Sequence, residues 1–173
     1  MAGENRKMVN EKLNLKFWKM HGASNDFIMF DDRKKIFPCT DKKWIASIAN
    51  RRIGIGSEGI ILIQKSRKAD FRMRFFNPDG GEAEMCGNGA RCAAKLAYDI
   101  GAAPSFMSIE TIAGVLRAEI KKHEVMLFMT PPKDWLFDKH IRFKNKKIIY
   151  SFVNTGVPHV VIIVKDIDLI NVK

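Results

Sequence analysis

The sequence lacks a long apolar run. Its longest stretch of large aliphatic residues is Val160–Val164, whereas a membrane-spanning helix needs about 20 predominantly apolar residues. The N-terminal residues mix charged and apolar side chains and contain no continuous apolar segment of the kind found in secretory signal peptides. These absences predict a cytoplasmic protein that does not associate with membranes.

Cysteine is scarce as well. The chain contains 3 cysteines, and an odd number at uneven spacing predicts neither a disulfide framework nor a CxxC metal-binding pattern. The sequence also has no cluster of metal-ligating side chains at the spacings typical of zinc sites. We therefore expect free thiols, no bound metal and no organic cofactor.

Acidic residues are few relative to basic ones. The 19 Asp and Glu residues face 30 Lys and Arg residues, which gives a formal net charge of +11. The basic residues are dispersed in short groups such as Arg33–Lys35, Arg51–Arg52 and Lys144–Lys147, and none alternates with aromatic residues as a nucleic-acid stacking platform would. We expect no nucleic-acid partner, and the charge equally suits an anionic small-molecule substrate.

The apolar pattern that is present indicates an α+β fold. Strands are predicted near residues 13–17, 27–30, 59–63, 71–75, 106–129, 148–153 and 160–164. Helices are predicted after Thr40 and after Cys86, and the second is rich in alanine. That composition favours a central helix with a curved sheet packed closely around it. The connections look too short for parallel crossovers, so we expect a mostly antiparallel sheet.

The domain organisation is predicted from two features. Residues 1–12 are polar and read as a flexible basic tail. The pair Pro131–Pro132 interrupts the strand pattern. We therefore predict a first domain over residues 13–130 and the beginning of a second, incomplete domain over residues 131–173.

The segment Glu82–Cys92, EAEMCGNGARC, places Cys86 directly before a glycine-rich turn and a predicted helix. A helix N-terminus favours the thiolate form of a cysteine, and glycine N–H groups can approach a carboxylate closely. This arrangement suits nucleophilic attack or proton abstraction next to a carboxylate. A buried cysteine before a helix capped by Asn88 explains the same pattern, and spacing alone does not decide between the two.

Three further polar residues lie at predicted turns. Asn25 and Asn77 each stand beside a strand, and His159 follows Pro158. Asparagine at a turn usually serves local hydrogen bonding, and the histidine could simply close a turn before a buried strand. Taken singly, these residues indicate no function.

Four segments together resemble the diaminopimelate epimerase family. They are KMHGASNDF (19–27), RRIGIGSEGIILI (51–63), FFNPDGGEAEMCGNGARC (75–92) and NTGVPH (154–159). The resemblance implies a cofactor-independent isomerase that interconverts LL- and meso-diaminopimelate for lysine and peptidoglycan synthesis. It also implies two similar lobes with the substrate between them, so that residues 13–130 would form the first epimerase lobe.

The resemblance implies a role for each matching residue. Cys86 matches the first of two catalytic thiols, which exchange the α-proton of the substrate. Asn25 and Asn77 match positions that hydrogen-bond the substrate, and Gly87 and Asn88 match a backbone cradle for its carboxylate. His159 matches a histidine close to the site.

The sequence departs from the family pattern at several points. Gly59 stands where some members have a substrate-contacting glutamine, and Val157 stands where many have a contacting asparagine. No segment matches the family's second Cys-Gly-Ser-Gly turn or its Glu-Arg pair. Helical geometry places Cys92 on a different side of the helix from Cys86, and Cys39 lacks an anion cradle. We therefore expect this chain to be inactive alone, because inversion needs a second proton-transfer group.

Two other functions remain open from the sequence. The chain could be a related cysteine-dependent amino-acid racemase that acts on another substrate, or a non-catalytic fragment that serves as a basic binding module. The partners expected for an epimerase are diaminopimelate and either a second copy of the chain, in a homodimer, or a complementing second-half chain.

Overall fold

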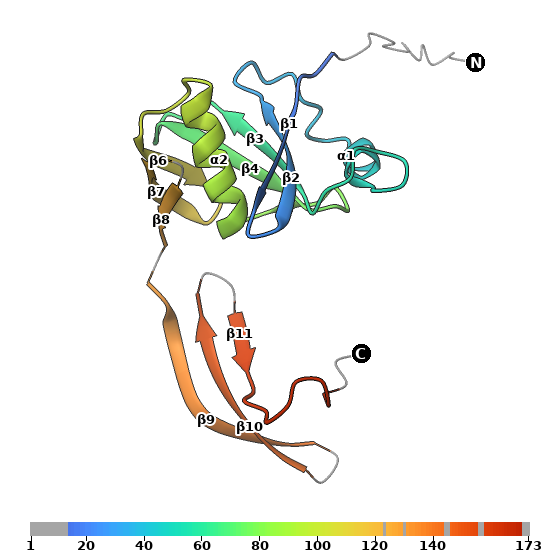
Figure 1. Cartoon of the computed structure of the whole chain (residues 1–173), viewed down its shortest axis with the longest axis vertical. Coiled ribbons are helices and arrows are strands. Elements are labelled where there is room, and N and C mark those ends of the chain that lie inside the picture. Colours follow the sequence, from blue (N-terminus) through green and yellow to red (C-terminus); the bar gives the residue numbers. More distant parts are fainter. Residues whose placement is uncertain (1–13, 123, 130, 144–145, 156–157, 171–173) are drawn as a thin grey trace, which may run out of the picture. The chain divides into compact units, whose positions relative to one another are not determined.

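The computed structural model describes residues 14–122, 124–129, 131–143, 146–155 and 158–170. The chain divides into two compact units, Met1–Leu127 (unit 1) and Phe128–Lys173 (unit 2). Each unit is described separately below. Both contain strands, and the helices of the described residues belong to unit 1 (Figure 1).

Unit 1 consists of one sheet and two helices within its described residues. The strand order is β1-β2-β3-β4-β6-β7-β8, and β5 pairs with β4. The elements are β1 (Trp18–Gly22), β2 (Asn25–Asp31), α1 (Lys42–Ala49), β3 (Ile60–Gln64), β4 (Phe71–Phe76), β5 (Glu82–Ala83), α2 (Gly87–Asp99), β6 (Phe106–Thr111), β7 (Gly114–Lys121) and β8 (Glu124–Phe128).

The two helices lie in crossover connections between parallel strands. β2 pairs with β3 in parallel, and so does β4 with β6. Parallel neighbours require a connection of about a dozen residues or more, usually with a helix, and α1 and α2 each occupy one. The expectation that the connections were too short for parallel crossovers was therefore wrong, although the other pairs of this sheet with a determined register are antiparallel.

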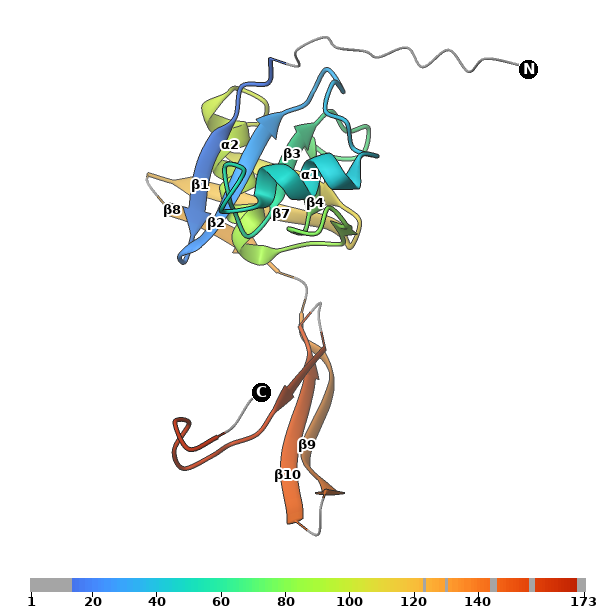
Figure 2. The same ribbon diagram turned by 90° about the vertical axis from the view of Figure 1, so that its right-hand side faces the viewer.

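Apolar side chains on both faces of the unit 1 sheet are buried. The alternation in β4 sends Phe71, Met73 and Phe75 into a core with α2, while Arg72 and Arg74 are only partly buried. A second core forms between the other face and α1 (Figure 2). Its residues are Ile28, Phe30, Phe37, Ile45, Ala49, Ile60, Leu62 and Phe76. The half-buried strand predicted at residues 71–75 is confirmed.

Helix α2 packs centrally because its side chains are small. Ala90, Ala93, Ala94 and Ala97 are fully buried against the sheet. A Cβ atom at Gly89 would lie 2.8 Å from Cδ1 of Ile61, so a larger residue in the first turn of the helix would force this β3 side chain to shift. The prediction of a central alanine-rich helix wrapped by a curved sheet is confirmed.

The first strand differs from its predicted position. Residues 14–17 are not in a strand, Leu13 lies outside the described residues, and β1 starts at Trp18. A two-residue turn sets this register: Gly22 pairs with Asn25, and the intervening Ala23 and Ser24 have φ angles of 51° and 63°. Positive φ at both central residues is the hairpin geometry that matches the twist of paired strands.

Helix α1 is also capped one residue later than predicted. The Asp41 side chain, and not that of Thr40, accepts a hydrogen bond from the Trp44 N–H. An aspartate at this position satisfies a backbone donor that the helix cannot satisfy itself.

Unit 2 is a three-stranded antiparallel sheet in the order β11-β10-β9. Its strands are β9 (Lys133–Phe143), β10 (Lys146–Asn154) and β11 (Pro158–Val161). The strand predicted at residues 148–153 lies within β10, whereas the one predicted at 160–164 ends at Val161. The sequence did not predict β9, which is exposed along its whole length.

Candidate active site

Cys86 caps the N-terminus of α2 with its sulfur atom. Its backbone is extended, with φ −136° and ψ 121°, and its Sγ accepts a hydrogen bond of 3.4 Å from the Gly89 N–H. The Cys86 carbonyl accepts the first helical bond, 2.7 Å from the Ala90 nitrogen. The thiol is only partly buried. The sulfur thus lies at the positive end of a 13-residue helix, where negative charge is stabilised.

Gly87 and Asn88 form the start of the first helical turn. Backbone N–H groups at this point have no carbonyl within the helix to bond. The Asn88 side chain does not take their place, because its Oδ1 accepts a hydrogen bond from Arg91. Two backbone donors next to the Cys86 sulfur are therefore available to an anionic ligand such as a carboxylate.

The strand register places three of the predicted site segments at one end of the unit 1 sheet. Asn25 begins β2, which runs parallel to β3, and Ile60 at the start of β3 pairs with Phe76 at the end of β4. Asn77 follows directly. Phe76 also pairs with Glu82, so that β5 leads from the same end into the Cys86 turn.

The hairpin that carries Asn25 packs against the first turn of α2. A Cβ atom at Gly22, the residue paired with Asn25, would lie 3.1 Å from the Asn88 carbonyl oxygen and 3.5 Å from Cys92 Sγ. Among the described residues, no hydrogen-bond partner reaches the buried Oδ1 of Asn25. A buried polar atom without a partner is rare and costs free energy. This oxygen is therefore an acceptor suited to a ligand donor such as an ammonium group.

Asn77 has a different environment. Its side chain is exposed, while its backbone closes the turn after β4: its N–H donates to the Gly81 carbonyl at 2.8 Å, and its carbonyl accepts from the Gly80 N–H at 2.9 Å. The turn predicted at Asn77 is confirmed, and its sequence, Asn-Pro-Asp-Gly, is rich in turn-forming residues. It leaves the Asn77 amide accessible at the end of the sheet where Asn25 lies.

An ion-pair network holds the Asn25 hairpin to the loop before β3. The Asp26 carboxylate lies 2.6 Å from Lys19 Nζ and 2.6 Å from Arg51, and Arg51 also binds Glu58 at 2.9 Å. The hydrogen bond from Arg51, together with Lys19, holds the pKa of Asp26 well below its usual range. The sequence did not indicate this network, although its members lie in two of the segments that resemble the family, 19–27 and 51–63.

Gly59 is required by close packing. A Cβ atom there would lie 2.4 Å from Cε2 of Phe75 and 2.8 Å from the Phe76 carbonyl oxygen. Position 59, where some family members have glutamine, therefore has no room for a side chain here, because Phe75 and Phe76 of β4 fill the space. Val157, the other departure, lies outside the described residues.

The other two cysteines are not placed like Cys86. Cys92 is 4% exposed and belongs to the core, and burial raises its pKa to about 11. Burial also raises the pKa of Cys39. Both thiols are less readily ionised than a free cysteine, which agrees with the expectation that neither partners Cys86.

His159 belongs to unit 2. It lies in β11, where it pairs with Val153 and is exposed. It is thus not one of the residues that the unit 1 register gathers around the Cys86 turn.

The described residues lack two features, a metal-binding cluster and a membrane-spanning helix. They contain no group of three or more His, Cys, Asp or Glu side chains that could hold a metal ion. They also contain no helix with the length and apolar character needed to cross a membrane.

Comparison with solved structures supports the fold. A hydroxyproline epimerase from Agrobacterium vitis superimposes with a TM-score of 0.65 at 16% identity, over 90% of this chain and 53% of that one. A phenazine biosynthesis protein of the PhzF family from Bacillus anthracis gives 0.60 at 18% identity, over 89% and 56%. At such identities the likeness concerns the fold alone, and it confirms the predicted α+β class.

Sequence comparison is more specific. A family model described as diaminopimelate epimerase matches residues 17–135. Diaminopimelate epimerases from Aquifex aeolicus and Brachyspira hyodysenteriae are 37% and 41% identical over 91% and 90% of this chain, which spans 60% and 62% of their lengths. With the match extending through the Cys86 turn and both asparagine segments, the chain belongs to the diaminopimelate epimerase family.

Proposed function

We propose that the chain supplies one half of a diaminopimelate epimerase active site. Unit 1 would be the first epimerase lobe, covering the predicted residues 13–130, and residues 131–173 would begin the second. The observation that carries this proposal is the position of Cys86, which caps α2 at the end of the sheet where a buried oxygen of Asn25 has no partner among the described residues. A cytoplasmic location suits such a biosynthetic enzyme.

In this proposal the Cys86 thiolate removes the α-proton of the substrate. The Cα–H bond breaks, an S–H bond forms, and the electron pair left on Cα is delocalised into the α-carboxylate. The backbone N–H groups of Gly87 and Asn88 bind that carboxylate and stabilise its added negative charge. In the reverse direction the Cys86 thiol returns the proton.

The two asparagines orient the substrate. Oδ1 of Asn25 accepts a hydrogen bond from the α-ammonium group, which satisfies the buried oxygen. The exposed amide of Asn77 binds the substrate from the end of β4. Fixed at both points, the substrate presents one hydrogen to the sulfur, and such positioning contributes substantially to rate.

Inversion requires a second group that delivers a proton to the opposite face of Cα. Neither Cys39 nor Cys92 can serve, because burial raises the pKa of each and Cys92 lies in the core. We therefore infer that residues 1–173 alone do not epimerise diaminopimelate. The second group comes from a complementing chain that corresponds to the part of the relatives beyond this match.

The test is α-proton exchange and inversion of LL-diaminopimelate in deuterated water, followed by proton NMR and chiral chromatography. The chain is assayed alone and mixed with the C-terminal remainder of the Aquifex aeolicus relative. We expect no inversion alone and inversion in the mixture. Cys86→Ser should lower the mixture's rate at least about a thousandfold, as expected for loss of a proton-transfer group, whereas the matched Cys39→Ser should retain it.

Two results would contradict the proposal. One is ordinary turnover by the chain alone, and the other is full activity of Cys86→Ser in the mixture. If the mixture instead exchanged the α-proton of another amino acid in preference to diaminopimelate, the chain would act as the related racemase that the sequence left open.

A further inference from the structure

A pocket of about 410 Å³ lies at the end of the unit 1 sheet opposite Cys86. Its basic lining residues are Arg33, Lys35, Lys65, Arg67, Lys68 and Arg72. Gln64 at the end of β3 pairs with Arg72 near the start of β4, whereas Ile60 and Phe76 pair at the Cys86 end. The volume falls within the range of small-molecule sites, and the position separates it from the proposed substrate site.

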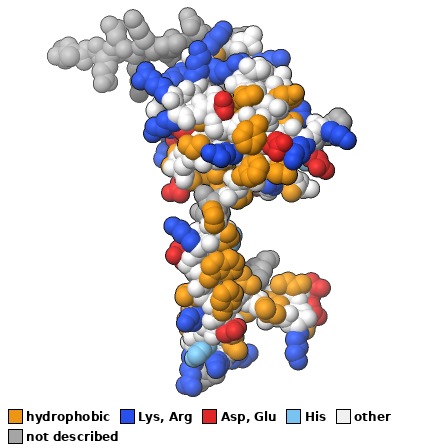
Figure 3. Space-filling view, turned by 90° about the vertical axis from the view of Figure 1, so that its left-hand side faces the viewer, with side chains coloured by type: hydrophobic (Ala, Val, Ile, Leu, Met, Phe, Trp, Pro, Cys, Tyr) orange, Lys and Arg blue, Asp and Glu red, His pale blue; other side chains and the backbone are white. Residues whose placement is uncertain are grey.

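The fold gathers basic residues that are dispersed in the sequence. The loop after β2, the β3–β4 connection and β4 itself each contribute to the pocket. Figure 3 shows Lys and Arg side chains over the upper part of unit 1. The acidic residue of the lining is Glu110, and its carboxylate already accepts a hydrogen bond of 2.5 Å from Ser66. The pocket is therefore strongly cationic.

Arg33 of this pocket is paired with Asp31, but four other cations of its lining have no acidic partner among the described residues. Among the residues that the structure describes, no carboxylate lies within ion-pair distance of Lys65, Arg67, Lys68 or Arg72. Like charges gathered without counter-charges repel one another, and a bound anion relieves that repulsion.

Arg72 provides the most specific observation. Its Nε is buried and has no hydrogen-bond partner among the described residues. Arg74 lies on the same face of β4 as Arg72, and two of its nitrogens donate to Glu82. Its Nε donates to Glu82 Oε1 at 2.7 Å, and its Nη2 donates to Glu82 Oε2 at 2.7 Å. A buried guanidinium N–H without an acceptor is costly. Arg72, which lines the pocket, thus retains an Nε–H donor that no acceptor of the described residues uses.

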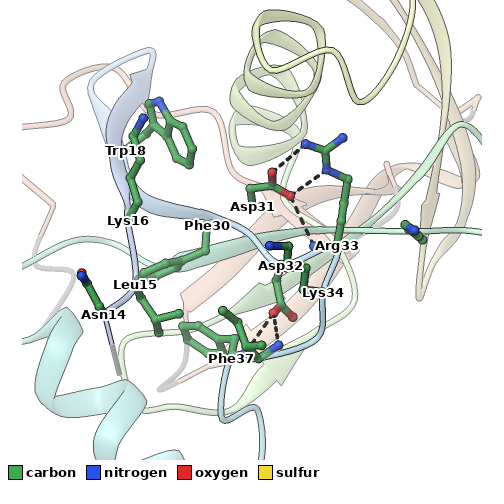
Figure 4. Close-up of a pocket in the computed structure, with 12 residues that line it drawn as sticks. Asn14, Leu15, Lys16, Trp18, Phe30, Asp31, Asp32, Arg33, Lys34 and Phe37 are labelled. Carbon is green, nitrogen blue, oxygen red and sulfur yellow. Dashed lines mark hydrogen bonds and ion pairs between the residues drawn. The ribbon is translucent and has the colours of Figure 1, made fainter. Parts of the chain in front are cut away.

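The adjoining pocket, of about 460 Å³, differs from the cationic pocket in its acidic residues (Figure 4). It shares Arg33 and Lys65 with the cationic pocket, but there the acids are present: Asp31 binds the Arg33 guanidinium at 2.7 and 2.8 Å. The buried Asp32 accepts hydrogen bonds from Phe37 N–H at 2.9 Å and Gln64 at 2.6 Å. That pocket contains two acids, Asp31 and Asp32, whereas the acid that lines the pocket around Arg72 is Glu110.

We propose that the pocket lined by Lys65, Arg67, Lys68 and Arg72 binds a small, multiply charged anion that carries phosphate groups. Arg72 donates its unused N–H to a phosphate oxygen, and the surrounding lysine and arginine side chains neutralise the charge. Guanidinium groups match the geometry of phosphate oxygens. The pocket is concave and has no aromatic lining, which favours a compact anion over a stacked nucleic-acid strand.

The test is calorimetric titration of the full chain with pyrophosphate at low salt. Arg72→Gln should weaken binding about tenfold or more, the loss typical of one charge-assisted hydrogen bond. Arg67→Gln should weaken it several-fold, and because Arg67 is exposed this variant keeps the test decisive if Arg72→Gln fails to fold. Arg117→Gln removes the same charge from an exposed position of β7 and should bind as tightly as the unaltered chain.

Three results would overturn the proposal. The first is absence of pyrophosphate binding at millimolar concentration. The second is equal weakening by all three variants, which would show a general charge effect. The third is binding of oligonucleotides that tightens with their length while pyrophosphate does not bind, which would identify a surface for nucleic acid.

Discussion

The two units of this chain differ in how far their β-sheets are covered by other elements. In unit 1 the sheet carries α2 on one face and α1 on the other, and β3 is buried at all five positions. In unit 2 the described residues form three strands and no helix, and β9 is exposed at every position. A sheet is stabilised by the layer that covers it, and a few strands without one are only marginally stable in water.

The exposed side chains of unit 2 are those that a covered sheet would bury. Trp135 and Phe137 stack with ring centroids 5.6 Å apart, yet they are 52% and 65% exposed. Ile141 and Ile149 are also more than half exposed. Figure 3 shows hydrophobic side chains gathered over unit 2, and an exposed apolar patch marks a site where other polypeptide packs. The relatives extend well beyond the matched region, and their additional length is the polypeptide we propose for this role.

Hydrogen exchange of the full chain should show the largest difference between the units. We expect amides of β3, β4 and α2 to exchange on the order of a thousandfold more slowly than those of β9 and β10, because only the former lie in a two-layer core. Mass spectrometry of peptides from each segment measures both sets in one experiment. Equal protection of the two units would contradict the contrast.

A matched pair of truncations tests the same contrast through stability. Ile61→Ala removes a side chain that is 0% exposed in the unit 1 core, and we expect it to lower the free energy of unfolding by about 2–5 kcal/mol. Ile149→Ala makes the same change where the side chain is 55% exposed, and we expect a change within about 0.5 kcal/mol. Urea denaturation followed by circular dichroism gives both values. A large effect of Ile149→Ala would show that this face is already covered.

The smallest effect is expected from acid titration of the unit 1 ion-pair network. Arg51, with Lys19, lowers the pKa of Asp26 in the folded chain, so the stabilisation is present above the unfolded pKa of about 4 and is lost as pH falls below it. Asp26→Asn should therefore lower the free energy of unfolding by up to about 1 kcal/mol at neutral pH. It should also flatten the decline of that free energy below about pH 4.

The control for this titration is Asp138→Asn in β9, where no ion pair is found among the described residues. We expect that variant to follow the unaltered chain at every pH. A pH dependence of unfolding that Asp26→Asn leaves unchanged would show that the network does not stabilise the fold.

The fold was predictable where a pattern is local. The alternation of β4, the turn that follows it and the alanine-rich helix after Cys86 can each be read within a dozen residues, and each is confirmed. Strand β9 was missed because Trp135, Leu136 and Phe137 are consecutive and do not alternate with polar residues. The parallel pairs were missed because strand order depends on contacts between residues far apart in the chain.

The candidate site was also predictable only where its residues lie in local sequence motifs. Motif resemblance identified Cys86, Asn25 and Asn77, and their roles remain proposals. The ion pairs of Asp26 with Lys19 and Arg51 were not foreseen, because no local pattern links these residues. The pocket around Arg72 was likewise not predicted, because the basic residues that line it are dispersed along the sequence.

By itself, the sequence determined the principal helices, most strands of unit 1, the thiol before a glycine-rich helix start and the family resemblance. These follow from residue type and short-range periodicity, which act over one or two turns. Only the tertiary structure decided which strand ends meet and why Gly59 has no room for a side chain. It also decided which buried atoms, Oδ1 of Asn25 and Nε of Arg72, lack partners within the described part of the chain. The reason is that strand pairing and packing join distant segments, and free donors and acceptors exist only once that packing is complete.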